Sequence, residues 1–324
     1  MATALFTHPS SLLHVTPEGH PERVDRMRAV NRVLASSHFK DLVRHEAGPA
    51  SDEMILRAHT PEHLRRLKSL APEEDFEFID PDTAMSPGTL EAALAASGAA
   101  AAAVDLVLSG GADNAFCAMR PPGHHAESFR AMGFCFFNSA AIAAHHARAR
   151  HGAERVAVVD FDVHHGNGTQ EIFWSDPNLF YGSTHQMPLF PGTGSVQETG
   201  VGNIFNAPLR AGDGGDRFRE AMATVILPAL DAFGPDLIVI SAGFDAHHRD
   251  PLGSLALAEE DFAWITLRLM ELAELHCGGR IVSVLEGGYD LQALAASVGV
   301  HVRALMEGTA GDMEDEGASS GDED

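Results

Sequence analysis

Basic side chains are scarce in this sequence of 324 residues. Its 22 lysines and arginines are outnumbered by 46 aspartates and glutamates, and the formal net charge is −24. Binding to nucleic acid or to an anionic membrane needs a basic surface, so this balance argues against both partners. Long hydrophobic runs are also missing. The longest weakly polar stretch, residues 92–108, is mostly alanine and contains Asp105, which argues against a membrane span.

Cysteine is equally scarce. Cys117, Cys135 and Cys277 are far apart and odd in number, which disfavours a disulfide framework and favours a reducing compartment. The N-terminus lacks the basic start and apolar core of a signal peptide. These absences predict a cytoplasmic protein. The sequence leaves the oligomeric state open, a homo-oligomer included.

The chain divides into a body and an acidic end. Residues 307–324 contain eight acids and no basic residue, separated by glycine and serine. This composition predicts a disordered acidic tail over 309–324. The rest has no internal repeat and no linker rich in proline, glycine and serine, so residues 1–308 are predicted to form one catalytic domain.

Hydrophobic patterning predicts alternating strands and helices in this body. Short apolar runs indicate strands buried on both faces, and strands separated by helices imply parallel crossover connections. The predicted strands are 114–119, 155–160, 178–183, 236–241 and 280–285. The predicted helices are 87–108, 138–150, 218–233, 259–276 and 291–306. We therefore expect a single three-layer α/β/α domain, of the α/β class, with a mainly parallel central sheet.

Polar motifs follow four of the predicted strands, at the carboxyl ends where parallel sheets bind ligands. They are Arg120-Pro-Pro-Gly-His-His125, Asp160-Phe-Asp-Val-His-His165, Gly243-Phe-Asp-Ala-His-His248 and Glu286-Gly-Gly-Tyr289. Asp162 and His164 alternate along an extended segment, so both can face one point, and Asp245 can supply a third ligand. Two carboxylates and one imidazole suit a divalent metal and leave a position for water and substrate.

The same motifs supply the other parts of a hydrolytic site. Two carboxylates neutralise the charge of the ion, so its water needs a separate base, which His124 or His125 could provide. Tyr289 follows two glycines, and its hydroxyl can donate to a developing oxyanion. Metal, water, base and oxyanion donor together predict metal-assisted amide hydrolysis.

These motifs resemble those of the zinc-dependent histone deacetylase family, in the class II-like branch that includes bacterial deacetylases and deacetylase-like amidohydrolases. The resemblance covers residues 5–306 and includes Gly19-His-Pro-Glu-Arg23 and Pro191-Gly-Thr-Gly194. It implies the arginase/deacetylase fold and the hydrolysis of N-acetyl amides, above all acetyl-lysine side chains in peptides or proteins, to acetate and a free amine.

The resemblance also implies residue roles. One Zn²⁺ per chain would be bound by Asp162, His164 and Asp245. The implied catalytic residues are His124, His125 as general base and acid, Tyr289 on the oxyanion, Asp160 behind His124 and Asn167 behind His125. The implied substrate-binding residues are Gly133, Phe134, Phe190, Leu252 and Gly288. Arg23 would lie behind the acetate-release side, near the backbone of Gly287 and Gly288.

Potassium is a further implied cofactor. Beside the zinc, its ligands would be the backbone carbonyls of Asp160, Asp162, His164 and Thr184, with the Ser183 hydroxyl. A second potassium would use Phe173, Asp176, Leu179 and Asn203.

Three alternatives compete with an acyl-lysine deacetylase. An acetylpolyamine or other small-molecule amidohydrolase shares the fold, and Leu252 lacks the carboxylate that would attract a polyamine chain. Ureohydrolases of the same fold need Asp-x-Asp, where this sequence has Asp245-Ala-His247. A catalytically dead binding module is disfavoured by the presence of His124, His125 and Tyr289 together.

Overall fold

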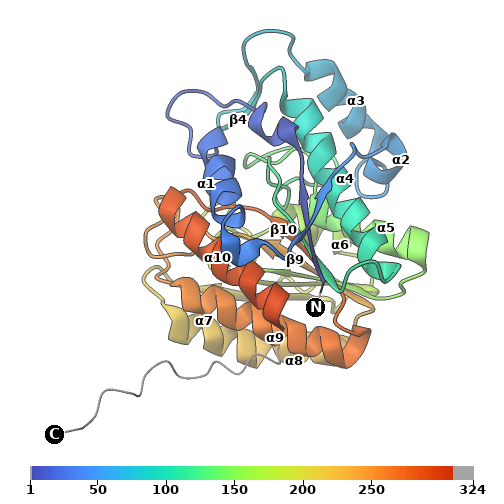
Figure 1. Cartoon of the computed structure of the whole chain (residues 1–324), viewed down its shortest axis with the longest axis vertical. Coiled ribbons are helices and arrows are strands. Elements are labelled where there is room, and N and C mark those ends of the chain that lie inside the picture. Colours follow the sequence, from blue (N-terminus) through green and yellow to red (C-terminus); the bar gives the residue numbers. More distant parts are fainter. Residues whose placement is uncertain (1, 309–324) are drawn as a thin grey trace, which may run out of the picture.

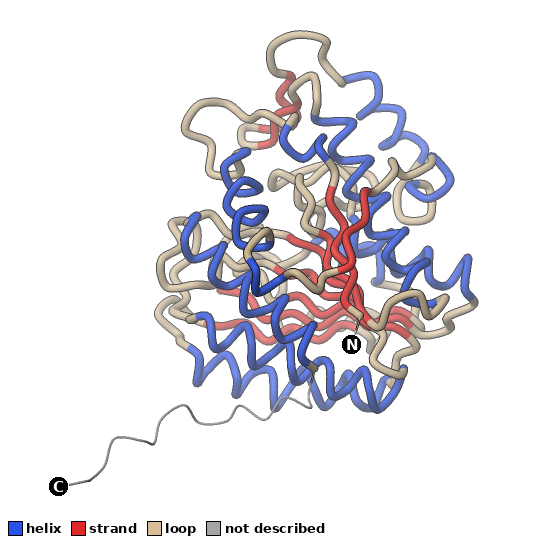
Figure 2. Tube along the Cα trace, in the orientation of Figure 1, coloured by secondary structure: helices blue, strands red, loops and turns tan. Residues whose placement is uncertain are grey.

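The central feature of the structure is one sheet in which every strand pair runs parallel. Figure 1 draws its strands as arrows, and Figure 2 marks them in red. The computed structural model describes residues 2–308. The eight strands follow the order β2 (Val43–Glu46), β1 (Thr3–Thr7), β5 (Asn114–Cys117), β10 (Ile281–Leu285), β9 (Leu237–Ala242), β6 (Val156–Asp160), β7 (Leu179–Gln186) and β8 (Ile204–Leu209). A separate antiparallel pair consists of β3 (Glu77–Asp80) and β4 (Thr83–Met85). The predicted α/β class is confirmed.

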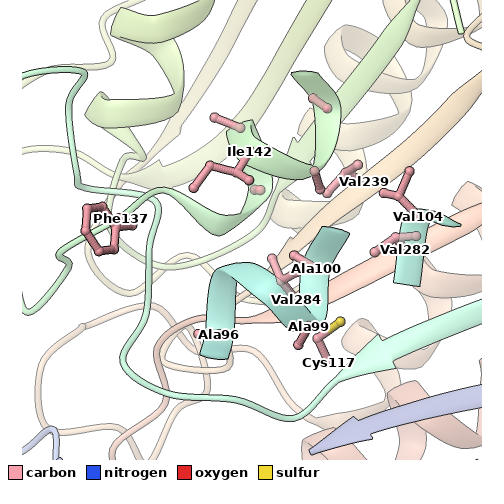
Figure 3. Packing of buried hydrophobic residues seen from close by; sticks show 14 of the residues in the cluster. Ala96, Ala99, Ala100, Val104, Cys117, Phe137, Ile142, Val239, Val282 and Val284 are labelled. Atoms are coloured by element: carbon pink, nitrogen blue, oxygen red, sulfur yellow. The ribbon is translucent and has the colours of Figure 1, made fainter. Parts of the chain in front are cut away.

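Helices cover both faces of the sheet (Figure 1). On one face, α4 (Thr89–Leu108) and α5 (Ser139–His151) pack their alanines against valines of the sheet such as Val239 (Figure 3). On the other face, Ile238 and Ile240 pack with α1 (Val24–Leu34), α9 (Glu259–Cys277) and α10 (Leu291–Glu307). Successive strand residues point to opposite faces, so β9 supplies both cores and is apolar except for Ser241.

The remaining helices are α2 (Asp52–Ile55), α3 (Pro61–Leu70), α6 (Asn167–Phe173), α7 (Gly215–Ala221) and α8 (Leu227–Phe233). The predicted helix 218–233 corresponds to α7 and α8 with a π-helical turn, Met222–Ile226, between them. Pro228 has no N–H, and its ring would clash with the carbonyl four residues earlier. A wider turn before this proline relieves that clash.

Parts of the fold lie outside the predicted elements. Strands β1, β2 and β8 were not expected; β2 is an edge strand with mostly exposed residues, so it has no apolar run to predict it. The predicted acidic tail, residues 309–324, lies outside the described residues.

Helix α4 is the one helix within residues 2–308 that is long and apolar enough to cross a membrane by length and composition. However, 67% of its most apolar window is buried inside the protein. Its buried alanines belong to the core shown in Figure 3, as expected for a core helix.

The four strands that precede the polar motifs are neighbours at the centre of the sheet, in the order β5, β10, β9 and β6. Because they are parallel, their carboxyl ends meet at one edge. The fold therefore brings together motifs that are separated by more than 100 residues in the chain.

Candidate active site

The three predicted metal ligands converge at this edge of the sheet. Asp162 and His164 follow β6, and Asp245 follows the neighbouring strand β9. All three are buried, and one ligand atom from each lies within 4.8 Å of the others. The Nδ1 atom of His164 is 3.1 Å from Asp162 Oδ1 and 3.2 Å from Asp245 Oδ2.

The surroundings of these carboxylates fit a divalent cation. Burial, together with the Asp162 carboxylate, raises the pKa of Asp245 to about 7. Although burial opposes it, hydrogen bonding to Asp162 and Asp245 raises the pKa of His164 to about 10. Both shifts mean that positive charge is favoured at this point. A Cβ on Gly287 would overlap both carboxylates, so glycine leaves room here. Two carboxylates and one imidazole, held in this way, are suitable ligands for zinc.

Two adjacent histidines face the same place from the loop after β5. His124 Nδ1 lies 3.0 Å from Asp160 Oδ2, and His125 Nδ1 lies 2.9 Å from Asn167 Oδ1. The Asn167 amide is oriented by its Nδ2, which donates to Glu127 Oε1 at 2.9 Å. In each ring a proton on Nδ1 completes the hydrogen bond, and Nε2 is left to accept a proton in the neutral ring.

The two histidines differ in proton affinity. Burial disfavours a charged His124, but the carboxylates of Asp162 and Asp160 outweigh it and raise its pKa well above the ordinary value. Burial, with repulsion from His124 and His164, lowers the pKa of His125 well below its ordinary value. His125 is therefore the neutral ring of the pair, with an acceptor nitrogen.

Tyr289 approaches from the loop after β10. Its ring centroid lies 6.0 Å from that of Phe134, and Phe190 lies 5.1 Å from the His125 ring. Burial raises the pKa of Tyr289 well above its ordinary value, so the hydroxyl stays protonated and can donate. A Cβ on Gly133 would overlap the His125 ring, so only glycine allows this close approach of the backbone.

The family model described as the histone deacetylase domain matches residues 20–305. The chain belongs to the histone deacetylase family. It is 43% identical to a histone deacetylase-like amidohydrolase of Pseudomonas aeruginosa over 84% of this chain and 73% of that protein. It is 38% identical to a probable deacetylase of Archaeoglobus fulgidus over 95% of this chain and 87% of that protein.

The crystal structure of the HDA15 HD domain matches this deacetylase with a TM-score of 0.90 and 36% identity, covering 95% of this chain and 89% of that chain. The predicted family and deacetylase fold are confirmed, and so is the prediction of a hydrolase that acts as a deacetylase.

The prediction for Arg23 is wrong, because Arg26 occupies that place in this deacetylase. The Arg23 side chain is half exposed at the N-terminal cap of α1. Arg26, three residues later, is fully buried, and its Nε donates to the Gly288 carbonyl at 2.6 Å. Its guanidinium also lies 4.9 Å from the centre of the Tyr289 ring. The first turn of α1 directs Arg26 inward, whereas Arg23, the arginine of the predicted motif, points outward.

Arg26 belongs to a buried ionic cluster that sequence reasoning did not find. Glu22 accepts from Arg26 Nη1 at 2.9 Å and from Arg120 Nε at 2.7 Å, and all three side chains are fully buried. The cluster ties α1 to the loop of the two histidines.

We expect Glu22→Gln to lower the free energy of unfolding by about 3–5 kcal/mol, because it leaves two buried guanidinium groups without a counter-charge. Chemical denaturation measures this change. Glu53→Gln is a matched control, since Glu53 pairs with Arg57 on the surface and its loss should cost under about 0.5 kcal/mol. Equal effects of the two variants would contradict the assignment.

Two further carboxylates position the loops of the site. Glu286 Oε2 accepts from the backbone N–H groups of Gly123 at 2.6 Å and His124 at 3.2 Å. Asp250 Oδ2 accepts from the Tyr289 N–H at 2.6 Å, and its Oδ1 accepts from the Leu252 N–H at 3.0 Å. Glu286 belongs to a motif recognisable in the sequence and Asp250 follows one by two residues, but only the folded loops show what they bind.

Because Asp250 fixes the backbone of Tyr289, we expect Asp250→Ala to lower kcat by about 10–100-fold, and Asp250→Asn to lower it less. Steady-state kinetics on an acetyl-lysine peptide measure both. If the loss acts through Tyr289, Asp250→Ala should cost little more when Tyr289 is already phenylalanine. If the kcat of the Asp250→Ala/Tyr289→Phe variant fell by the product of the two single losses, this link would be refuted.

A second group of possible metal ligands lies away from the site. Asp105 Oδ1 is 2.7 Å from His146 Nε2 and 2.6 Å from His151 Nε2. Arg57 lies against His146 Nδ1, so the neutral ring carries its proton on Nε2 and donates it to Asp105. His146 is therefore a buried link between α4 and α5.

The expected second potassium site is not supported. The carbonyl oxygens of Phe173, Asp176 and Leu179 do converge, as predicted. However, they converge on the Asn203 side-chain amide, whose Nδ2 lies 2.9, 3.0 and 2.6 Å from them. An amide donor thus satisfies the carbonyls that a cation would need.

Proposed function

We propose that this deacetylase hydrolyses acetyl-lysine side chains with one zinc ion per chain. The proposal depends on one observation above all: Asp162, His164 and Asp245 converge beside two histidines with distinct hydrogen-bond partners. Asp162, His164 and Asp245 would hold the ion. When bound, zinc would supply positive charge that polarises the attacking water and the amide carbonyl.

His125 is proposed as the general base and acid. Its Nδ1 is engaged by a neutral amide, Asn167, so the ring has no adjacent carboxylate partner to hold a proton on it permanently. As the water oxygen bonds to the carbonyl carbon, Nε2 takes a proton from the water. As the C–N bond breaks, the same nitrogen returns a proton to the amine, which leaves acetate and a free lysine.

His124 and Tyr289 are proposed to stabilise the charge that develops. His124, paired with Asp160, contributes positive charge beside the reacting oxygen. The Tyr289 hydroxyl donates to the carbonyl oxygen as it becomes an oxyanion.

Phe134 and Phe190 are proposed to flank the lysine stem, with the Gly133 backbone close to both the His125 and the Phe190 rings. Leu252 and Gly288 complete the proposed substrate contacts. The apolar Leu252 offers no carboxylate to the charged chain of an acetylpolyamine. We also propose a potassium ion beside the zinc, at the backbone of Asp160, Asp162, His164 and Thr184 with the Ser183 hydroxyl.

A turnover screen tests the substrate. Metal-free protein is reloaded with zinc and compared on an acetyl-lysine peptide, a longer acyl-lysine peptide and an acetylated polyamine. We expect the highest kcat/KM for the acetyl-lysine peptide, with activity lost on chelation and restored by zinc. Preference for the polyamine would favour the small-molecule alternative, and turnover without metal would refute the zinc proposal.

A further inference from the structure

Beside Tyr289 the surface forms a hollow of about 370 Å³ that contains two arginines. Arg23 comes from the start of α1 and Arg249 from the loop after β9, and Tyr289, Asp290 and Gln292 also line it. This arginine hollow is unusual in a protein with a net charge of −24. The proposed reaction makes no use of either guanidinium.

The two guanidinium groups are incompletely paired. Within residues 2–308, the interaction that we find for the Arg23 side chain is a distant ion pair with Asp25 at 3.9 Å, and the side chain is 51% exposed. Asp25 lies closer to Arg28, at 2.8 Å. Each guanidinium has five N–H donors, so Arg23 has donors left for a ligand.

Arg249 is similar. Its Nη2 donates to Gln292 Oε1 at 2.8 Å and lies 3.4 Å from Asp290, and the side chain is 44% exposed. The Asp290 carboxylate is itself engaged by the N–H groups of Gln292 and Ala293 at the start of α10. The helix N-terminus therefore offsets part of its negative charge, and the hollow keeps an excess of positive charge.

Carboxylates also lie near the site, at the turn that contacts Phe134. Asp80 ends β3 and Asp82 lies in the turn before β4, and the His20 ring contacts the Asp82 carbonyl at 3.0 Å. His20 packs against Phe134 at 4.7 Å, and Phe134 in turn lies 6.0 Å from Tyr289. Asp82 is thus joined to the Phe134 side of the site, and the arginine hollow lies beside Tyr289.

We propose that the arginine hollow binds a substrate carboxylate, so that this deacetylase prefers peptides with an acidic residue next to the acyl-lysine. This inference rests on the proposed acyl-lysine substrate. Guanidinium groups bind carboxylates through paired N–H···O bonds, and exposed pairs of this kind are modest in strength. The expected preference is therefore about three- to tenfold in kcat/KM.

Three acetyl-lysine peptides that differ only in the neighbouring residues, Glu, Gln or Lys on both sides, test the proposal. At low salt, the kcat/KM of the wild-type protein should be about three- to tenfold higher for the Glu peptide than for the Gln peptide, and lowest for the Lys peptide. High salt should reduce these differences. The double variant Arg23→Gln/Arg249→Gln should bring the Glu to Gln ratio near one. Arg217→Gln removes the same charge from an exposed side chain on α7 and should keep the wild-type ratio.

Equal turnover of the Glu and Gln peptides by wild type, or an unchanged ratio in the double variant, overturns the inference while the proposed function stands. Absence of turnover with all three peptides by zinc-loaded wild type overturns the proposed function and this inference with it. Melting temperatures of the variants establish that each ratio is measured on folded protein.

Discussion

Asp245→Ala is expected to yield a folded protein that retains little zinc and has a kcat lowered by roughly 10³-fold or more. The side chain supplies one of three ligand groups, and its removal leaves Asp162 and His164 as an incomplete set. The charge stabilisation that a bound cation provides is worth several kcal/mol, which corresponds to this loss in rate. Elemental analysis of zinc per chain and kcat on an acetyl-lysine peptide measure the two effects.

The cluster of Asp105, His146 and His151 provides a matched control. It has the same ligand types in another part of the protein, with Asp105 half-buried between the two histidines. Asp105→Ala should leave both zinc content and kcat near wild type. If Asp105→Ala lost the metal and Asp245→Ala kept it, the assignment of the catalytic site would be wrong.

Tyr289→Phe is expected to lower kcat by about 10²–10³, as for the loss of one oxyanion donor, while zinc remains bound. The phenol donates a hydrogen bond without bringing a charge that would compete for the metal. Phenylalanine keeps the ring and its contacts with Phe134 and Arg26, so only the hydroxyl is lost. Steady-state kinetics and zinc content of the variant are the measurements.

The alternative is that the Tyr289 ring only packs within the loop after β10 and takes no part in catalysis. In that case Tyr289→Phe would leave kcat within threefold of wild type, and the oxyanion role would have to be abandoned. A fall in kcat accompanied by loss of zinc would instead point to a disturbed metal site.

The central part of the fold could be predicted because its strands are buried on both faces. Residues 156–160 and 237–242 are apolar almost throughout, and helices with clear limits separate them, so the sequence alone indicates a parallel sheet. β2 is an edge strand whose residues are mostly exposed, and no apolar run distinguishes it from a loop. β2 is a strand because it forms hydrogen bonds with β1, and the sequence of β2 alone does not show this pairing.

The metal ligands and histidines could be predicted for a related reason, since each follows directly after a predictable strand. Arg26 shows the limit of this approach. The predicted motif contains Arg23, but Arg26 lies three residues later, and only the start of α1 and the buried Glu22 decide which of the two turns inward. Asn203 is a second example, because it was expected to bind a cation, whereas its side-chain amide donates to the carbonyls of Phe173, Asp176 and Leu179.

The position of β5, β10, β9 and β6 within the sheet has a consequence for fluctuations. Each of these strands has a hydrogen-bonded neighbour on both sides, whereas β2 and β8 have one. Edge strands detach in local openings that need less free energy than global unfolding. Such openings leave the strands beneath the catalytic groups paired. Their amide hydrogens should therefore be among the slowest to exchange with solvent, and turnover should persist on heating until the whole domain melts.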